Sequence, residues 1–294
     1  MSKIFIGTVF GASCGAIFAS VLSASALTIT QTTTPADLTT ALSGGGLAIT
    51  SVTVNNGASS QFGTYTGFTS PPVTIGNGVV LSTGQVIQTT AAFHSSSGSP
   101  DTNTGQPGTA EFNAYGPGHI TGFNNSNDVA SLTVNFTLSA PSQVGFDFIF
   151  GSVEFPVFTN SFTDAFLAFL DGTATANQIS FDASNNAVQV GSSFAGQLTT
   201  ADTNTAFSDP HGLLKLQTFT ANQLSAGAHS IIFEVGDVND HALDSAVFIS
   251  NLHAGAGTGG TGPVTPIGTV PEPATLLLFG SGLTGLIWWR VRHT

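Results

Sequence analysis

The alternation of apolar and polar residues with a period of two is the feature that most constrains how this chain folds. In residues 131–138, SLTVNFTL, every second side chain is apolar, and residues 143–150, QVGFDFIF, repeat the pattern. Such alternation is typical of a β-strand with one buried face. Residues 230–237 and 245–254 supply two more strong strand candidates. Weaker candidates lie at residues 47–55, 78–83, 166–170, 178–182, 187–190 and 214–219.

Helical periodicity is convincing at one place, residues 35–42. There Thr34 stands where a capping side chain belongs, Pro35 suits the first turn, and Asp37 favours the positive end of the helix dipole. Many short strands, Gly-rich turns and almost no helix favour an antiparallel two-sheet β-sandwich or a jelly-roll-like fold. We therefore expect an all-β domain over residues 27–252.

Two polar segments interrupt this strand pattern. Residues 94–128 are rich in Gly, Pro, Ser and Asn and carry few strand signals. A segment of that length inside a compact domain is functional, partly disordered or an insertion, and we expect a long mobile surface loop. Residues 253–270 are rich in Gly, Thr and Pro without apolar periodicity, which predicts a flexible linker after the domain.

The charge of the chain excludes one large class of partner. Lys and Arg total 4 against 16 Asp and Glu, and the net charge is −12. Between residues 27 and 270 the only Lys or Arg is Lys215, against fifteen acidic side chains. Because binding to phosphates needs Lys and Arg, nucleic acid is excluded as a partner, whereas divalent cations remain plausible.

The N-terminus has the layout of an export signal. Lys3 precedes an apolar stretch over residues 4–22, and Ala24 and Ala26 form a small-residue cleavage pattern. This order predicts a helical signal peptide over residues 1–26, export through the Sec translocon and cleavage after Ala26. A transmembrane anchor or a buried helix is the alternative. The only cysteine lies in this stretch, so the exported domain has neither a disulfide nor a Cys-ligated zinc.

The C-terminus has the layout of a membrane helix. The apolar run at residues 274–289 would extend about 24 Å as a helix, slightly less than the ~30 Å hydrocarbon core. Two tryptophans end it, and Arg290 and Arg292 behind them would stay in the cytoplasm. We expect a transmembrane helix here that leaves residues 27–270 outside the cytoplasm. A buried core helix is the alternative, but the three Gly of the run disfavour it.

The same tail resembles a known sorting signal. Pro271, Glu272 and Pro273, then the apolar run, then Arg290 and Arg292 resemble the PEP-CTERM signal of Gram-negative bacteria in all three parts and in their order. The resemblance implies recognition by an exosortase embedded in the inner membrane, which acts near the Pro-Glu-Pro motif. The protein would then leave the membrane for the cell surface or the extracellular matrix.

The central region resembles the choice-of-anchor L domain, found in bacterial surface proteins with different C-terminal anchors. The resemblance covers about residues 36–252, and residues 144–172 are its most specific part. It implies an all-β extracellular module of undetermined activity. Where the family usually has two adjacent glutamates, this chain has Val153 and Glu154, so one acidic position is missing. The matching blocks are GVVLSTG at 78–84, DVASLTVNFTL at 128–138, VGFDFIFGSVEFPVFTNSFTDAFLAFLDG at 144–172 and GDVNDHALDSAVFI at 236–249.

Acidic side chains gather between two of the strong strand candidates. Asp237, Asp240 and Asp244 occur within eight residues, and Glu154 and Asp164 could approach them from another loop. Carboxylates crowded on turns are what Ca²⁺ prefers, since it takes six to eight oxygen ligands in flexible geometry. The alternative is that they are ordinary turn residues. Their spacing is not that of an EF-hand, so a calcium site requires these loops to meet in space.

Catalytic patterns are missing from the sequence. The seven His are scattered, no HExxH pair occurs, and no Ser sits in a G-x-S-x-G turn. We therefore expect a protein that is not an enzyme. Three hypotheses remain: a structural or adhesive component of the envelope or extracellular matrix, a calcium-dependent lectin-like module that binds extracellular polysaccharide, and a secreted polysaccharide hydrolase. A hydrolase would need a carboxylate pair such as Glu154 and Asp164.

Overall fold

The computed structural model describes residues 26–70, 73–95, 99–182, 184–191, 198–199, 203–214, 217–220 and 223–255. The predicted signal peptide up to residue 25, the transmembrane helix at 274–289 and the Pro-Glu-Pro motif lie outside these residues. Over the described ranges, no helix has both the length and the apolar character needed to cross a membrane.

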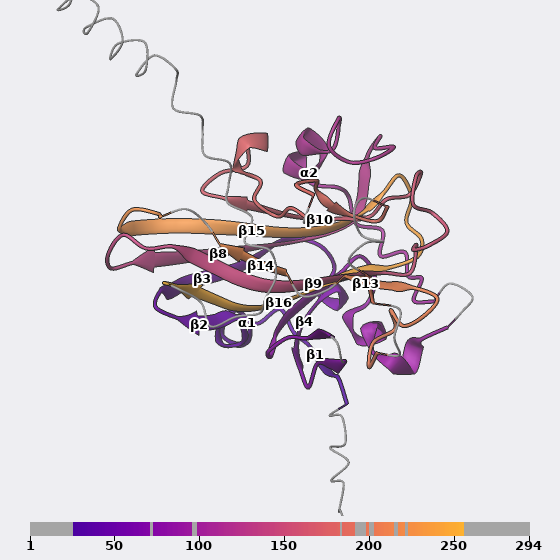
Figure 1. Cartoon of the computed structure of the whole chain (residues 1–294), viewed down its shortest axis with the longest axis horizontal. Coiled ribbons are helices and arrows are strands. Elements are labelled where there is room, and N and C mark those ends of the chain that lie inside the picture. Colours follow the sequence, from indigo (N-terminus) through magenta and orange to yellow (C-terminus); the bar gives the residue numbers. More distant parts are fainter. Residues whose placement is uncertain are drawn as a thin grey trace, which may run out of the picture.

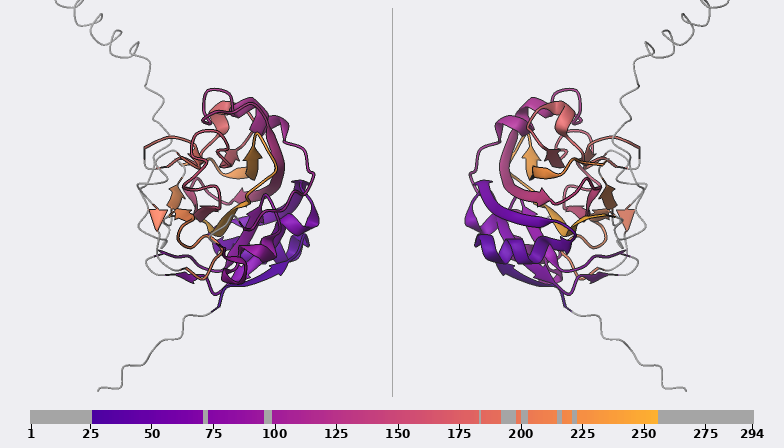
Figure 2. Two further views of the ribbon diagram at one scale, coloured as in Figure 1. Left: turned by 90° about the vertical axis from the view of Figure 1, so that its right-hand side faces the viewer. Right: turned by 90° about the vertical axis from the view of Figure 1, so that its left-hand side faces the viewer.

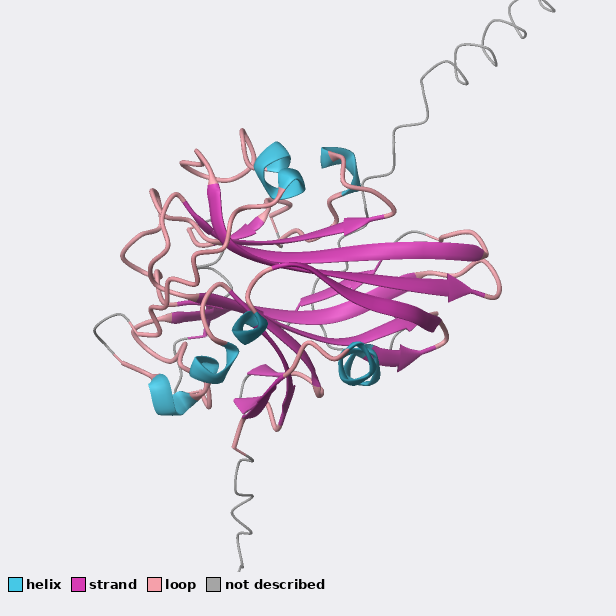
Figure 3. Ribbon diagram, turned by 180° about the vertical axis from the view of Figure 1, so that it is seen from behind, coloured by secondary structure: helices cyan, strands magenta, loops and turns pink. Residues whose placement is uncertain are grey.

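Two layers of strands face each other, which confirms the expected all-β, two-sheet class (Figures 1 and 3). The larger sheet has the order β1-β4-β7-β16-β9-β13-β12, with β14 also paired to β9 and β2 to β16. Its bounds are β1 Thr28–Gln31, β2 Ser43–Gly45, β4 Phe62–Thr66, β7 Gly78–Ser82, β9 Val144–Ser152, β12 Leu198–Thr199, β13 Gly212–Leu214, β14 Gln217–Thr220 and β16 Ser245–Ala254.

The smaller sheet has the order β11-β10-β15-β8-β3, and β5 and β6 form a separate pair. All pairings described in the three sheets are antiparallel except that of β2 with β16. Figure 2 shows the N-terminal part of the domain, in indigo and purple, gathered on one side of the molecule. The bounds are β3 Ala48–Asn56, β5 Thr69–Ser70, β6 Val73–Thr74, β8 Ser126–Leu138, β10 Ala165–Leu170, β11 Val188–Gln189 and β15 Gly227–Val238.

Phenylalanine side chains join the two sheets. The rings of Phe146 on β9 and Phe233 on β15 have centroids 4.9 Å apart, and those of Phe148 on β9 and Phe166 on β10 are equally close. All four side chains are buried. Burial of one such side chain stabilises a fold by about 1.5–3 kcal/mol. The period-two pattern therefore becomes the core between the sheets.

The helix expected at residues 35–42 is α1, Pro35–Leu42, and it packs Leu38 and Leu42 against strands of both sheets, β3 of the smaller and β4, β7 and β16 of the larger. One local detail differs. Thr34 occupies the N-cap position but its side chain makes no capping hydrogen bond. The hydroxyl of Thr32 instead donates to Asp37 Oδ2 at 3.0 Å, and this bond ties the preceding chain to the first turn.

The four strong strand candidates are confirmed as β8, β9, β15 and β16, and three weaker ones as β3, β7 and β10. The candidate at 187–190 shrinks to the two residues of β11, and that at 214–219 falls on the end of β13 and on β14. The candidate at 178–182 is wrong, because it forms only isolated bridges. Asp182 ends it by accepting hydrogen bonds from the backbone N–H groups of Ser184 and Asn186, each at 2.9 Å, which turns the chain.

The segment expected as a mobile loop, residues 94–128, contains a short helix, α2 at Ala110–Tyr115. The hydroxyl of Thr109 caps it by accepting from the N–H of Phe112 at 3.2 Å, and Phe112 is buried against the outer face of the smaller sheet. Six residues are too few for a visible helical period. The described part of the segment is thus packed onto the sandwich, and its mobility stays a prediction. The described residues also include four 3₁₀ turns: η1 Ser59–Gln61, η2 Val86–Thr89, η3 Ala91–Phe93 and η4 Thr175–Asn177.

Candidate functional site

Two chain segments cross between the sheets at the same end of the sandwich. Residues 153–164 lead from β9 in the larger sheet to β10 in the smaller one, and residues 239–244 lead from β15 back to β16. Because Ala165 pairs with Gly236 and Ser245 pairs with Ser152, the two crossings must lie side by side. The carboxylates predicted on both loops are therefore brought to one place, which we call the carboxylate cluster: Glu154, Asp164, Asp237, Asp240 and Asp244.

Asp164 connects the two crossings. Its backbone N–H donates to Glu154 Oε2 at 3.2 Å, which joins the two ends of the first crossing. Its own carboxylate accepts from the backbone N–H of Val238 at 3.1 Å and from the hydroxyl of Ser245 at 2.7 Å. Both acceptor bonds come from the ends of the second crossing. Asp164 is fully buried and holds the loops in register.

Other carboxylate oxygens in the cluster have no such partners. Asp237 is fully buried at the end of β15, and neither of its oxygens makes a hydrogen bond of normal geometry, although the hydroxyl of Thr83 lies close enough to oppose the rise in its pKa. Asp244 is also fully buried: Oδ1 accepts from the backbone N–H of Thr102 at 2.8 Å, whereas Oδ2 has no partner. Oδ1 of the half-buried Asp240 is likewise unpaired. Burying a polar atom without a hydrogen bond costs free energy, so these oxygens need a partner that the described residues do not supply.

The pKa values follow from this burial. Burial raises the pKa of Glu154 far above its usual range, and the Asp164 charge beside it adds to the rise. Burial raises the pKa of Asp244 to about 7, although hydrogen bonds oppose it, and it raises the pKa of Asp240 as well. For Asp237, burial and then the charge of Asp164 raise the pKa well above normal. No Lys or Arg stands among the described residues to offset these charges.

Two further acidic residues join the cluster and were not among the predicted ligands. Asp128, at the start of β8, is fully buried and accepts from the backbone N–H of Gln106 at 2.6 Å, with His241 Nδ1 at 3.0 Å from its Oδ2. Asp101 Oδ1 accepts from the backbone N–H of Leu243 at 3.1 Å. Asp128 lies here because β8 pairs with β15, and this pairing cannot be predicted from a local sequence pattern.

Backbone also approaches the cluster closely. A Cβ on Gly84, just after β7, would lie 1.7 Å from Asp244 Oδ2, so any larger residue would displace that carboxylate. Gly84 therefore belongs to the site as a residue whose lack of a side chain leaves room for Asp244. The sequence gives no way to tell this glycine from the chain's many other ones.

The donor set of this site is made of oxygen atoms, which suits a hard cation such as Ca²⁺. Across the described part of the chain, however, no three His, Cys, Asp or Glu side chains stand in a ready-made metal arrangement. A cation would have to draw the unpaired oxygens of Asp237, Asp240 and Asp244 together, with backbone or water oxygens completing the shell. The residues present suit such an ion in chemistry and in burial, but not in their present arrangement.

In comparisons with known proteins, two regions of the chain match family models. Residues 27–253 match the model of the choice-of-anchor L domain. The chain belongs to the choice-of-anchor L family. A second model, the PEP-CTERM protein-sorting motif, matches residues 269–292. Both resemblances seen in the sequence are thereby confirmed, and no curated protein gives a significant match. The sorting motif marks this choice-of-anchor L protein as one that an exosortase recognises and that is exported to the cell envelope or surface.

The most specific block of the choice-of-anchor L resemblance, residues 144–172, coincides with β9, the first crossing and β10. It therefore carries Glu154 and Asp164 into the carboxylate cluster. Outside the described residues lie Ala24 of the predicted cleavage site and the sorting residues Pro271, Glu272, Pro273, Arg290 and Arg292.

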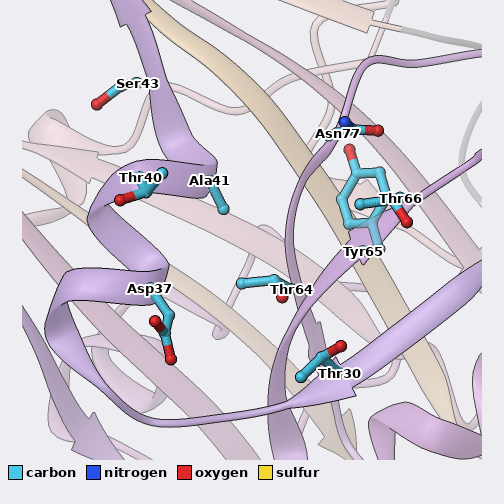
Figure 4. Close-up of a pocket in the computed structure, with 9 residues that line it drawn as sticks. All are labelled: Thr30, Asp37, Thr40, Ala41, Ser43, Thr64, Tyr65, Thr66 and Asn77. Atoms are coloured by element: carbon cyan, nitrogen blue, oxygen red, sulfur yellow. The ribbon is translucent and has the colours of Figure 1, made fainter.

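A separate cavity of about 600 Å³ opens between α1, β1 and β4 of the choice-of-anchor L domain (Figure 4). Most of its lining side chains carry a hydroxyl, and Asp37 and Asn77 add a carboxylate and an amide. It shares no residue with the carboxylate cluster. Its lining is Thr30, Asp37, Thr40, Ala41, Ser43, Thr64, Tyr65, Thr66 and Asn77.

Proposed function

We propose that this choice-of-anchor L domain is a calcium-stabilised structural and adhesive module of the cell surface or extracellular matrix. The observation that carries the proposal is the buried carboxylate cluster, in which both oxygens of Asp237 and one of Asp244 lack a partner. Burying unpaired carboxylates costs several kcal/mol each, and a divalent cation offsets that cost. The sorting motif supports delivery of the protein to the outside of the cell, where the carboxylate cluster would bind calcium.

The chemistry of the cluster favours Ca²⁺ over other metals. Zinc prefers Cys and His, but the only cysteine lies within the predicted signal peptide, and among the described residues His241 is the one histidine with a contact to the cluster, through Asp128. Mg²⁺ demands near-ideal octahedral geometry, whereas Ca²⁺ accepts irregular sets of six to eight oxygens. Extracellular calcium modules bind with dissociation constants of about 10⁻⁴–10⁻³ M.

Thermal unfolding of the exported protein in calcium and in excess chelator tests this proposal. At 100 times the dissociation constant, a ligand stabilises by about 2.7 kcal/mol. For a domain of this size that corresponds to a rise in Tm of about 5–10 °C. The same concentration of Mg²⁺ should give a much smaller rise. Equal Tm values in calcium and in chelator would refute the calcium site.

The proposal includes a role without catalysis. Glu154 and Asp164, the pair that a hydrolase would need, are 1% and 0% exposed, and a carboxylate that does not reach solvent cannot touch a polysaccharide chain. This burial supports a structural role for the pair. Turnover of polysaccharide by the wild type, abolished by Glu154→Gln in a protein that still folds, would establish the hydrolase instead.

Carbohydrate binding is the second candidate, and the cavity beside α1 favours it. Its hydroxyl, amide and carboxylate lining suits a neutral polyhydroxylated ligand such as an extracellular polysaccharide. Because the cavity and the carboxylate cluster share no residue, binding there should not depend directly on calcium. Screening on a glycan array should show binding that Thr64→Val weakens, and a blank array would remove this candidate.

A further inference from the structure

Residues 100–106, PDTNTGQ, lie across the end of the sandwich that holds the carboxylate cluster, and we call them the strap. The strap is joined first to the second crossing. The backbone N–H of Asp244 donates to the carbonyl of Pro100 at 3.0 Å, and that of Leu243 donates to Asp101 Oδ1 at 3.1 Å. In return, the backbone N–H of Thr102 donates to Asp244 Oδ1 at 2.8 Å.

The other half of the strap is fastened to Asp128. The backbone N–H and the hydroxyl of Thr104 donate to the two oxygens of Asp128 at 3.1 and 2.7 Å, and the N–H of Gln106 donates at 2.6 Å. The backbone N–H of Asp128 returns a bond to the carbonyl of Gln106 at 2.8 Å. Asp128 and Asp244, which hold the strap, both contribute to the negative field at Asp237.

Apolar burial contributes little to holding the strap down. Only Pro100, at one end of the strap, is apolar and buried; none of residues 101–106 has an apolar side chain, and along them the chain alternates between exposed and half-buried positions. Its attachment therefore depends on hydrogen bonds to carboxylates, which are stronger than hydrogen bonds to neutral acceptors when the carboxylate is ionised. Those same carboxylates repel one another and Asp237 when nothing positive lies between them. A cation in the cluster removes this repulsion and keeps Asp128 and Asp244 in place as acceptors.

We propose that the strap is a cation-dependent cover: it closes over the carboxylate cluster when a divalent cation is bound and loosens when the cation leaves. This inference rests on the calcium site proposed above and names the part of the fold that the site controls. Closure would slow the loss of the ion and shield the crossings from proteases outside the cell. The ion would thus stabilise one end of the domain more than the other.

Hydrogen exchange of single amides tests the strap in the exported wild-type protein, with calcium and with chelator. Calcium should slow exchange of the Thr102, Thr104 and Gln106 amides by at least about tenfold more than exchange elsewhere. The matched control is the amide of Ser230, which donates to the Asp171 carboxylate at 2.9 Å. That bond lies at the opposite end of β15, away from the cluster.

Calorimetric titration with calcium alone separates the two proposals. Calcium binding with equal protection of the strap and of Ser230 would overturn the strap and leave the calcium site standing. Absence of binding would overturn both. A matched variant, Thr104→Val, removes only the hydroxyl bond to Asp128. It should keep calcium affinity within about threefold while strap amides exchange faster, because one of several strap bonds is lost. Unchanged exchange in this variant would also count against the strap.

Discussion

The two ends of the β10–β15 ladder carry the same type of residue in opposite circumstances. At one end Asp171 accepts from the backbone N–H of Ser230 at 2.9 Å and lies 2.7 Å from His229 Nδ1. At the other end Asp164 and Asp237 are fully buried, and Asp237 makes no hydrogen bond of normal geometry. A carboxylate at the end of a strand is therefore not in itself a binding site. The distinguishing features of Asp237 are its burial and the absence, among the described residues, of a His, Lys or Arg in contact with it.

This difference separates the two interpretations of the acidic residues. Asp171 behaves as a turn residue, since it bonds local backbone, reaches solvent and has a histidine beside it. Asp237 does none of these things. A cation is the simplest group that would make the second end resemble the first.

The largest expected effect comes from exchanging one acid at each end for its amide. Asp237→Asn should abolish the calcium-dependent rise in Tm, about 5–10 °C in the wild type, because it removes a central ligand. In chelator the variant should unfold at the same or a higher temperature, since the amide removes the cost of burying Asp237 either as an unpaired carboxylate or in its protonated form. Asp171→Asn is the control and should keep the full calcium shift. If Asp237→Asn keeps the full calcium-dependent rise in Tm, Asp237 does not differ from Asp171 in calcium binding and the comparison fails.

A third carboxylate, that of Glu234 on β15, adds a second test of the comparison between Asp171 and Asp237. Glu234 on β15 is fully buried under α2: Oε2 accepts from the hydroxyl of Thr109 at 3.1 Å, and Oε1 has no partner. Burial, and then the Glu111 charge, raise its pKa to about 8. Because this pKa lies above that of the unfolded chain, the folded state keeps a proton that the unfolded state loses. The contribution of Glu234 to stability is therefore greatest below pH ~4 and falls as the pH rises toward 8.

Glu234→Gln should flatten this dependence. The wild type should lose on the order of 3–5 kcal/mol from this group between pH ~4 and ~8, at 1.36 kcal/mol per pKa unit. Urea unfolding of the wild type and the variant at several pH values measures the difference between their slopes, in which the contribution of the carboxylate cluster cancels because it is present in both proteins. If wild type and variant show the same slope, the buried proton on Glu234 is refuted.

The smallest expected effect on stability is at the end of the ladder where Asp171 has hydrogen-bond partners. Burial lowers the pKa of His229, but the hydrogen bonds to Asp171 and to the Ser225 carbonyl, together with the Asp171 charge, outweigh it, and the net pKa is raised. The pair therefore stabilises below the unfolded pKa of about 6.5, and its contribution disappears as pH rises through the folded pKa. His229→Gln should cost less than about 1 kcal/mol at pH 6, typical of a pair near the surface, and still less at pH 9. Chemical unfolding at both values measures it, and a larger loss at pH 9 would contradict the pairing.

The strands with strong alternation could be predicted because each of them contributes apolar side chains to the core. β1 and β4, at the margin of the larger sheet, could not, since Thr, Gly and Gln make up most of their residues. The candidate ligands on the two crossings were identified from acidic spacing between strands. Asp128 and Gly84 were missed because their roles depend on β-pairing and on close approach of the backbone to Asp244.

By itself the sequence determined the all-β class, the helix at Pro35–Leu42 and the sorting motif, because these follow from local periodicity and local signals. It also placed five acidic residues next to strand ends. Only the tertiary structure decided that both crossings lie at one end, that Asp237 is left without a partner there, and that the strap covers them. The physical reason is that burial and pairing depend on strands more than seventy residues apart in sequence, whereas alternation depends on the next residue but one.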